Sequence, residues 1–428
     1  MTETHRRRPS PAACRGPLAL LVVAAAVAAL AAAATPSPAA QAQPDPLADA
    51  AWRPLPGDAP LGGHAAVLRG GAMVLVGGER DDFAAPAAIR ALDLAADPPR
   101  WVTVAEAGPA PQPQLAGRGL VGARTAALDG TAAVMLCDCT GATAHALDWA
   151  GGPDATLTWR PLAGGPPLPH LYGLLVHDAP RRRLVAAGGD YRGSGDLVTA
   201  TFTLDTAALD AAWQPAAPLP FQRIFQAADR DPRSGHLVAF SGQGPDALPS
   251  NALWRGDLAA LDGSGAWADI TALAGDGPAA RSGATLTFLG DRGLAVLFGG
   301  YTPDAGERAD AWLLDYRDPT APRWRALERS GAPSARSGHS AVWDEAGQRL
   351  ILYGGLRVEG DGTTYLSDAF ALDLAPDAAT PPATTSAPTT AAASPTPGPS
   401  DTPTVAPTAA PRIFLPSVLR AAVVRPAP

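Results

Sequence analysis

The chain contains a repeated pattern in which a short apolar run ends at a pair of glycines or at its remnant. Successive intervals along this series are 60, 51, 53, 58 and 55 residues. A nearly constant period of this length is typical of repeat architectures, in which each repeat forms one small unit of secondary structure. The intact pairs are Gly77-Gly78, Gly188-Gly189, Gly299-Gly300 and Gly354-Gly355, and the remnants are Ser241-Gly242 and Cys137-Asp138.

Each unit has the same internal order, which the last two units illustrate. A first β-type run, as at 339–343, precedes the apolar run into the glycines, as at 350–353. A run ending in Leu-Asp follows, as at 371–373, and then a Trp-led run, as at 324–327. Four short runs joined by Gly, Pro and Asp turns predict a four-stranded antiparallel sheet. No stretch of ten or more residues between Trp52 and Leu374 has a helical period.

Tryptophans and aspartates recur at set places in these units. A large indole on the outer strand is expected to fill the wedge between neighbouring sheets. An Asp after the third strand is expected to accept backbone N–H groups in a turn. The tryptophans are Trp52, Trp101, Trp159, Trp213, Trp267 and Trp324, and the aspartates are Asp93, Asp148, Asp205, Asp257, Asp315 and Asp373.

The tryptophan series is offset from the glycine series. The first Trp run comes before the first glycine pair, and none follows the last. The sixth unit therefore lacks an outer strand, while the N-terminal side has one to spare. Pairing Trp52–Pro56 beside Asp368–Leu374 would close a ring of six units and remove an exposed sheet edge.

The order of motifs in each unit resembles the kelch repeat. An apolar run ends in Gly-Gly, a run ending in Leu-Asp follows, and Trp-x-x-Leu comes last. The resemblance covers about 320 residues, from Trp52 to Leu374. Two units are degenerate, since the second lacks both glycines and the fourth lacks one. The resemblance implies an all-β fold, a six-bladed β-propeller with one four-stranded antiparallel blade per repeat, closed by the N-terminal outer strand.

Composition divides the rest of the chain. A basic start, an Ala-rich apolar run and Ala40-Gln41-Ala42 predict a cleaved signal peptide at 1–42, and hence secretion. The propeller then occupies 43–375. Residues 376–411 are nearly all Pro, Thr, Ala and Ser, which predicts a disordered linker. Residues 412–428 form a short apolar tail, too short and too interrupted to span a bilayer, for which association with the cell surface is a hypothesis.

The charge balance limits the partners that the chain can take. The formal net charge is −8, so nothing indicates a nucleic acid or an anionic membrane. All 33 basic residues are arginines. The lack of lysine excludes Schiff-base catalysis and lysine general bases. The mature chain is expected to be a monomer without a stable membrane span.

Counting back 18 residues from the first glycine-pair position identifies a set of basic residues. The kelch resemblance places this position at one mouth of the central channel, where guanidinium groups would suit a carboxylate or phosphate. The alternative is that each arginine bonds carbonyls and Asp residues between blades. The candidate ligand-binding residues are His170, Arg223, Arg281 and Arg336 in register, Arg118 one residue away from it, and His339, which aligns with His64.

Cys137 and Cys139 are the only cysteines beyond the predicted signal peptide. Three interpretations remain open for this pair. They are two small packed residues, a local disulfide, or part of a metal site with His145 as the nearest histidine. No metal site is predicted from so few ligands.

Binding without catalysis is the favoured function, with an extracellular protein or glycan, anionic in character, as the partner. The residues do not match those that copper oxidases of the galactose oxidase type or sialidases require. The alternative is a carbohydrate-active enzyme similar to kelch-type sialic acid mutarotases, which need only anion binding plus a base. No catalytic residue, cofactor or metal is predicted.

Overall fold

The computed structural model describes residues 46–374, apart from 82–83, 114–119, 121, 129–131, 138, 140–141, 150, 168–170, 191–195, 264 and 361. The predicted signal peptide (1–42), linker (376–411) and tail (412–428) lie outside the described residues. Within the described part, no helix has the length and apolarity needed to cross a membrane.

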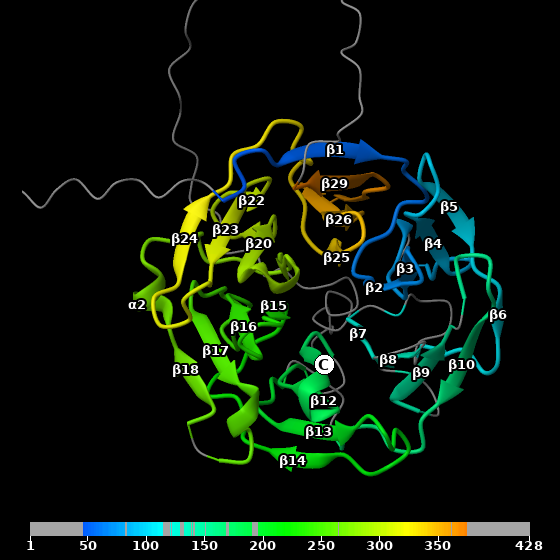
Figure 1. Cartoon of the computed structure of the whole chain (residues 1–428), viewed down its shortest axis with the longest axis horizontal. Helices are drawn as coiled ribbons and strands as arrows, with labels where there is room; N and C mark the ends of the chain where they lie inside the picture. Colours follow the sequence, from blue (N-terminus) through cyan, green and yellow to red (C-terminus); the bar gives the residue numbers. More distant parts are fainter. Residues whose placement is uncertain are drawn as a thin grey trace, which may run out of the picture. The chain divides into compact units, whose positions relative to one another are not determined.

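Six antiparallel sheets are arranged in a ring within the compact unit that begins at Asp49 (Figure 1). We number them as blades 1–6 in the order of their innermost strands. Blade 1 consists of β2 (Ala65–Arg69), β3 (Ala72–Val76), β4 (Arg90–Asp93) and β5 (Arg100–Thr103). Blade 2 consists of β7 (Arg124–Ala127), β8 (Ala132–Leu136), β9 (Ala144–Asp148) and β10 (Leu157–Pro161), with a short added strand β6 (Glu106–Ala107).

The next two blades have four strands each. Blade 3 consists of β11 (Leu174–Asp178), β12 (Arg183–Ala187), β13 (Thr201–Asp205) and β14 (Gln214–Ala216). Blade 4 consists of β15 (Ala227–Arg230), β16 (His236–Phe240), β17 (Leu253–Asp257) and β18 (Trp267–Asp269).

Blades 5 and 6 each carry an extra hairpin after their second strand. Blade 5 consists of β19 (Thr285–Phe288), β20 (Leu294–Phe298), β23 (Ala311–Asp315) and β24 (Arg323–Ala326), with hairpin β21 (Tyr301–Thr302) and β22 (Gly306–Glu307). Blade 6 consists of β25 (Ser340–Asp344), β26 (Arg349–Tyr353), β29 (Ala369–Asp373) and β1 (Ala51–Leu55), with hairpin β27 (Leu356–Glu359) and β28 (Gly362–Tyr365).

Helical structure in the described residues is limited to single turns. They are α2 (Thr271–Ala274) and the 3-10 turns Ala179–Arg181, Leu258–Ala260 and Gly290–Arg292.

The closing strand of the ring lies where the offset of the tryptophan series predicts it. β1 pairs antiparallel with β29, with Trp52 opposite Leu372 and Leu55 opposite Ala369. In Figure 1, β1 is the outermost strand of the blade that otherwise contains only C-terminal strands. The predicted closure is therefore confirmed, with the closing strand one residue nearer the N-terminus than expected.

The four-stranded design is confirmed with one addition. In blade 2, β6 adds a fifth, parallel strand beside β10, through the pairs Leu157–Glu106 and Thr158–Ala107. The second strand of a blade is the most deeply buried, since every residue of β3 and of β20 is buried. This agrees with the near-continuous apolar runs in the sequence, because a strand covered on both faces needs apolar residues throughout.

The outer-strand tryptophans pack between adjacent blades, as expected. Trp52 of blade 6 lies 5.5 Å, centroid to centroid, from Phe298 of blade 5. Trp324 of blade 5 lies 5.3 Å from Phe240 of blade 4. Each indole therefore joins its own blade to the one before it.

The aspartates of the Leu-Asp series hold the turns after the third strands. Asp205 Oδ1 accepts a hydrogen bond from the N–H of Ala207, and Asp257 Oδ1 accepts one from Ala259, both at 2.8 Å. Asp93 and Asp315 accept equivalent backbone bonds. The structural role predicted for these four residues is confirmed.

Candidate functional site

The mouth of the channel is defined by a chain of backbone hydrogen bonds near the start of the innermost strands. Each blade contributes one residue with positive φ, and in five of the six blades the N–H of this residue donates to the carbonyl of the corresponding residue in the preceding blade. The donor–acceptor pairs are Gly63–Gly338, Gly338–Gly283, Gly283–Phe225, Phe225–Tyr172 and Tyr172–Gly122. The register positions lie two residues before these residues in the sequence, so they too come together at one end of the ring.

Arg336 in blade 6 is completely buried at this mouth. Its Nη1 and Nη2 donate to the two carboxylate oxygens of Asp368, at 2.6 and 2.9 Å. Nη1 also donates to the carbonyl of Gly354, while Nε and Nη2 donate to the carbonyl and hydroxyl of Ser334. A guanidinium has five N–H donors, so Arg336 has none left for a ligand.

Arg281 in blade 5 has the same arrangement. It is 1% exposed and makes a bidentate pair with Asp310, at 2.7 and 2.9 Å. Its other bonds go to the carbonyls of Ala279 and Gly299. Burial by itself would raise the pKa of Asp310, but the hydrogen bonds and charge of Arg281 outweigh it, so the pKa is lowered. These two arginines bond carbonyls and an Asp, as the structural alternative expected, but the partners lie within the same blade rather than between blades.

His339 and His64 lie buried between blades, and the Nδ1 of each has no hydrogen-bond partner among the described residues. His339 Nε2 lies 2.9 Å from Thr285 Oγ1 in blade 5, and His64 Nε2 lies 2.7 Å from Ser340 Oγ in blade 6. Burial lowers the pKa of His64 to about 3. Burial, and then the charges of Arg336 and His64, lower the pKa of His339 well below its usual value. Both imidazoles are therefore neutral at pH 7.

Blade 4 differs, because its register arginine has no bidentate carboxylate partner. Arg223 is half-buried, and its Nη1 donates to the carbonyl of Gly242 at 3.1 Å, while its Nε has no hydrogen-bond partner in the part of the chain that the structure describes. Burial lowers the pKa of Arg223, and the charge of the nearby Asp246 partly offsets this. In blade 4 the backbone carbonyl of Ala252 accepts a hydrogen bond from the N–H of Ser241. In blade 5 the carbonyl of Asp310 accepts one from the N–H of Gly299, so Ala252 and Asp310 occupy equivalent positions. Alanine thus replaces the carboxylate that neutralises the arginine in blade 5.

Two glutamines beside Arg223 carry buried polar groups without partners. Gln226 is 7% exposed, and neither its Oε1 nor its Nε2 has a hydrogen-bond partner among the described residues. Gln243 is 3% exposed, and its Oε1 has no partner in the same part of the chain, although its Nε2 donates to the carbonyl of Ala247. Gln226 contacts the backbone at Gly242, since a Cβ built on this glycine would lie 2.6 Å from Gln226 Cγ. Arg223, Gln226, Gln243 and Asp246 are called the blade 4 cluster below.

Two of the six candidate residues cannot be placed. Arg118 and His170 lie outside the described residues. In blade 2 the residue structurally equivalent to Arg336 is Leu120, because the Leu120 carbonyl accepts a hydrogen bond from the N–H of Gly78, as the Arg336 carbonyl accepts one from Gly300. Within the described residues, the predicted basic ring therefore reduces to two neutralised arginines and Arg223.

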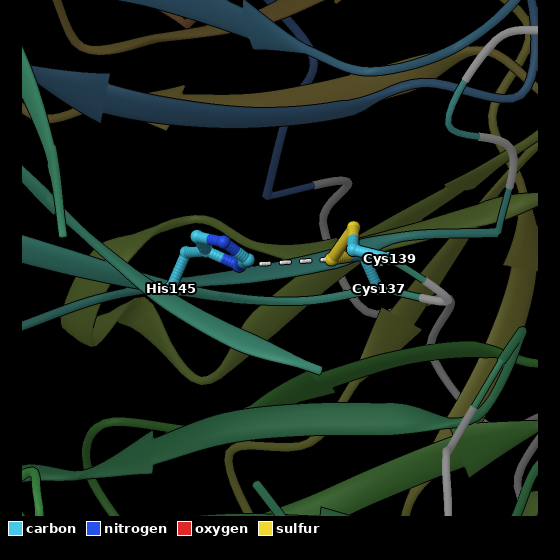
Figure 2. A group of neighbouring side chains, drawn as sticks. All are labelled: Cys137, Cys139 and His145. Carbon is cyan, nitrogen blue, oxygen red and sulfur yellow. Dashed lines mark hydrogen bonds between the residues drawn. A yellow bond between two sulfur atoms is a disulfide. The ribbon is translucent and has the colours of Figure 1, made fainter. Parts of the chain in front are cut away.

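Cys137 and Cys139 form a disulfide, the second of the three interpretations that the sequence allowed. Figure 2 shows His145 directed at this bridge, with its Nδ1 3.8 Å from Cys137 Sγ.

Comparison with known proteins agrees with the repeat and the fold. No protein-family model matches the chain. Over 141 residues it is 33% identical to Adagio-like protein 3 of Oryza sativa subsp. japonica, which covers 33% of this chain and 21% of that protein. The same identity relates it to the Putative adagio-like protein 2 of that organism. The solved structure titled "Structure of YjhT" superimposes with a TM-score of 0.50 and 14% identity, over 74% of this chain and 96% of that one.

The chain is a kelch-like β-propeller. It spans about a fifth of the length of the adagio-like proteins, 21% in each case. It also matches 85 residues of the Dynein alpha chain, flagellar outer arm, of Chlamydomonas reinhardtii at 39% identity, which is 2% of that protein. These likenesses concern the repeat and the architecture of the kelch-like propeller.

Sequence reasoning missed Gln226, Gln243 and Asp246 in this kelch-like propeller. The available signal was the residue immediately before each third strand, which is Asp in blades 5 and 6 but Ala252 in blade 4. Where a blade has the arginine at the register position but lacks this aspartate, the arginine has no carboxylate partner within its own blade.

Proposed function

We propose that this kelch-like propeller is a secreted binding protein that recognises a carboxylate-bearing sugar of an extracellular glycan at the blade 4 cluster. The observation that carries the proposal is that, among the described residues, Arg223 Nε and amide atoms of two neighbouring buried glutamines have no hydrogen-bond partner. Secretion rests on the sequence of residues 1–42 and remains a prediction.

The chemistry of the cluster suits an acidic sugar. A buried polar group without a partner costs about 1–3 kcal/mol, so a ligand that supplies the missing bonds recovers this free energy. Sugar hydroxyls both donate and accept, as the amides of Gln226 and Gln243 require. A guanidinium is well suited to a carboxylate. Arg281 and Arg336 support the site indirectly, because their internal pairs leave them unable to compete for the ligand.

Direct binding tests the proposal. The full chain would be applied to a glycan array and titrated with N-acetylneuraminic acid in a calorimeter. Arg223→Ala is expected to weaken binding about 10- to 150-fold, as expected when a charge-assisted bond of about 1.5–3 kcal/mol is lost. Arg160→Ala is the matched control, since Arg160 is a half-buried arginine on β10 that pairs with Asp210. Equal affinities of the two variants, or a response to acidic peptides alone, would contradict the sugar proposal.

A second candidate, a mutarotase of the sialic acid type, is favoured by one observation. Asp246 is an exposed carboxylate close to Arg223, because a Cβ built on Gly244 would lie 3.0 Å from Asp246 Oδ1 and 3.6 Å from Arg223 Nη1. With the sugar carboxylate on Arg223, Asp246 would accept the anomeric hydroxyl proton as the ring C–O bond breaks, and the ring oxygen would take a proton from solvent.

Anomer exchange distinguishes the two candidates. Proton NMR of a freshly dissolved single anomer would show faster equilibration with the wild-type chain, and Asp246→Asn would abolish the acceleration while leaving binding largely intact. Binding without any acceleration would leave the non-catalytic proposal and reject the enzyme.

A further inference from the structure

Three potential metal ligands meet in the buried part of blade 2. Sγ of Cys137, Sγ of Cys139 and a ring nitrogen of His145 all lie within 4.8 Å of one another. The three residues are 3%, 2% and 3% exposed. In Figure 2 the imidazole and the bridge face each other, with the Nδ1 edge of the ring toward Cys137. This group is separate from the blade 4 cluster.

The strand register explains why these side chains meet. In the β8–β9 hairpin, Met135 is opposite His145, and the N–H of Cys137 donates to the carbonyl of Thr143 just beyond the last strand pair. Side chains alternate along a strand, so Met135 and Cys137 lie on one face. His145 shares this face and is the diagonal neighbour of Cys137.

We propose that reduction converts the Cys137–Cys139 disulfide into a Cys2His site for a thiophilic d10 cation, with Zn²⁺ as the preferred ion. The oxidised chain holds a disulfide, and the reduced chain holds the metal. The site is thus governed by the redox state of its own ligands.

The conversion balances in two steps. A dithiol reductant supplies two electrons and two protons, which breaks the S–S bond, leaves two thiols on the chain and converts the reductant to its disulfide. Zn²⁺ then forms two Zn–S bonds and one Zn–N bond, and the two thiol protons pass to solvent. Three protein ligands leave one position of a tetrahedral zinc ion open.

The observed spacing fits the bound state closely. With Zn–S and Zn–N bonds of about 2.3 and 2.0–2.1 Å, tetrahedral geometry places a sulfur about 3.6 Å from the ligating nitrogen. The observed distance from Cys137 Sγ to His145 Nδ1 is 3.8 Å. The Cα atoms of the two cysteines are 5.3 Å apart. Binding therefore mainly requires the two sulfurs to separate to about 3.8 Å.

The surroundings favour a divalent ion over a monovalent one. Both cysteines belong to an apolar cluster that also contains Trp149, Leu157 and Trp159. Two thiolates, a neutral imidazole and Zn²⁺ sum to zero charge, whereas Cu⁺ would leave one negative charge in this apolar environment.

Metal content of the full chain tests the inference. The protein is reduced anaerobically with a phosphine, which becomes its oxide with oxygen from water, and is incubated separately with Zn²⁺ and Cu⁺. After removal of free ions, a chromogenic chelator measures the bound metal, and circular dichroism reports folding. Cys14→Ser is the matched control, because it removes the only other thiol of the chain.

Reduced wild type and Cys14→Ser should each bind about one Zn²⁺ per chain, and oxidised wild type none. Cys137→Ser/Cys139→Ser should bind none, and His145→Asn should bind at least about tenfold more weakly. If reduction unfolds the chain, Zn²⁺ should restore the fold. The proposal fails if reduced wild type binds no zinc, folded or not, if His145→Asn binds equally well, or if only Cu⁺ binds.

Discussion

Trp52→Ala should destabilise the propeller by about 3–5 kcal/mol, because Trp52 fills the gap between the closing strand and blade 5. The side chain is 5% exposed and packs on Phe298. A buried Trp removes about 150–250 Å² from water, which at about 25 cal/mol per Å² gives about 4–6 kcal/mol. Partial burial in the unfolded chain reduces this value. The Arg53–Asp373 pair on the same strand is partly exposed and adds about 1 kcal/mol at most.

Urea unfolding and amide hydrogen exchange would check this value and its location. Trp213→Ala is the matched control, since Trp213 is also 5% exposed but lies in blade 3, whose four strands follow one another in sequence. Both variants should lose similar free energy of unfolding. Only Trp52→Ala should accelerate exchange in β1 and β29, because β1 is joined to its blade by pairing alone. A loss below about 1 kcal/mol, or unchanged protection of β29, would refute closure by this strand.

Two further predictions concern the buried polar groups of the mouth. Asp310→Asn should lower the free energy of unfolding in urea by about 3 kcal/mol, because it leaves buried Arg281 without its carboxylate partner. Asp246→Asn, at an exposed position, should change this free energy by less than about 0.5 kcal/mol. Similar losses in the two variants would contradict the structural role of the Arg281–Asp310 pair. His64 protonates near pH 6.5 when unfolded but near 3 when folded, so its contribution to stability is present above pH 6.5 and is lost as the pH falls toward 3. His64→Gln should therefore reduce the slope of unfolding free energy against pH in this window by up to about 1.4 kcal/mol per pH unit, and an unchanged slope would show that His64 is not the titrating group.

The fold was predictable because its signals are local and repeated. Each unit of about 50 residues contains strands of alternating apolar and polar residues, glycine turns and a Trp-led outer strand. Because this pattern recurs in six blades, a degenerate unit can be assigned from the other units. The sequence did not predict the short strand β6 or the hairpins of blades 5 and 6, because these elements lie outside the pattern that recurs in every unit.

The sequence register identified Arg223, Arg281 and Arg336 as equivalent residues of their blades, which the structure shows, whereas a ligand-binding role for them stays a prediction. It did not identify their partners, because Asp310 and Asp368 lie 29 and 32 residues after their arginines, beyond loops of different length. Spacing in the sequence does not show which arginine is neutralised and which is left with a partnerless nitrogen.

A closed six-bladed ring follows from the amino-acid sequence, because strand alternation and the orphan Trp52 strand leave an unpaired edge unless the two ends of the repeat array meet. Which polar groups are satisfied depends on the tertiary structure. Arg336 is buried against Asp368, Gln226 has no side-chain partner among the described residues, and His145 lies at the cysteine bridge. The physical reason is that hydrogen bonds and ligand geometry act over a few ångströms in space, and loops set those distances independently of the repeat.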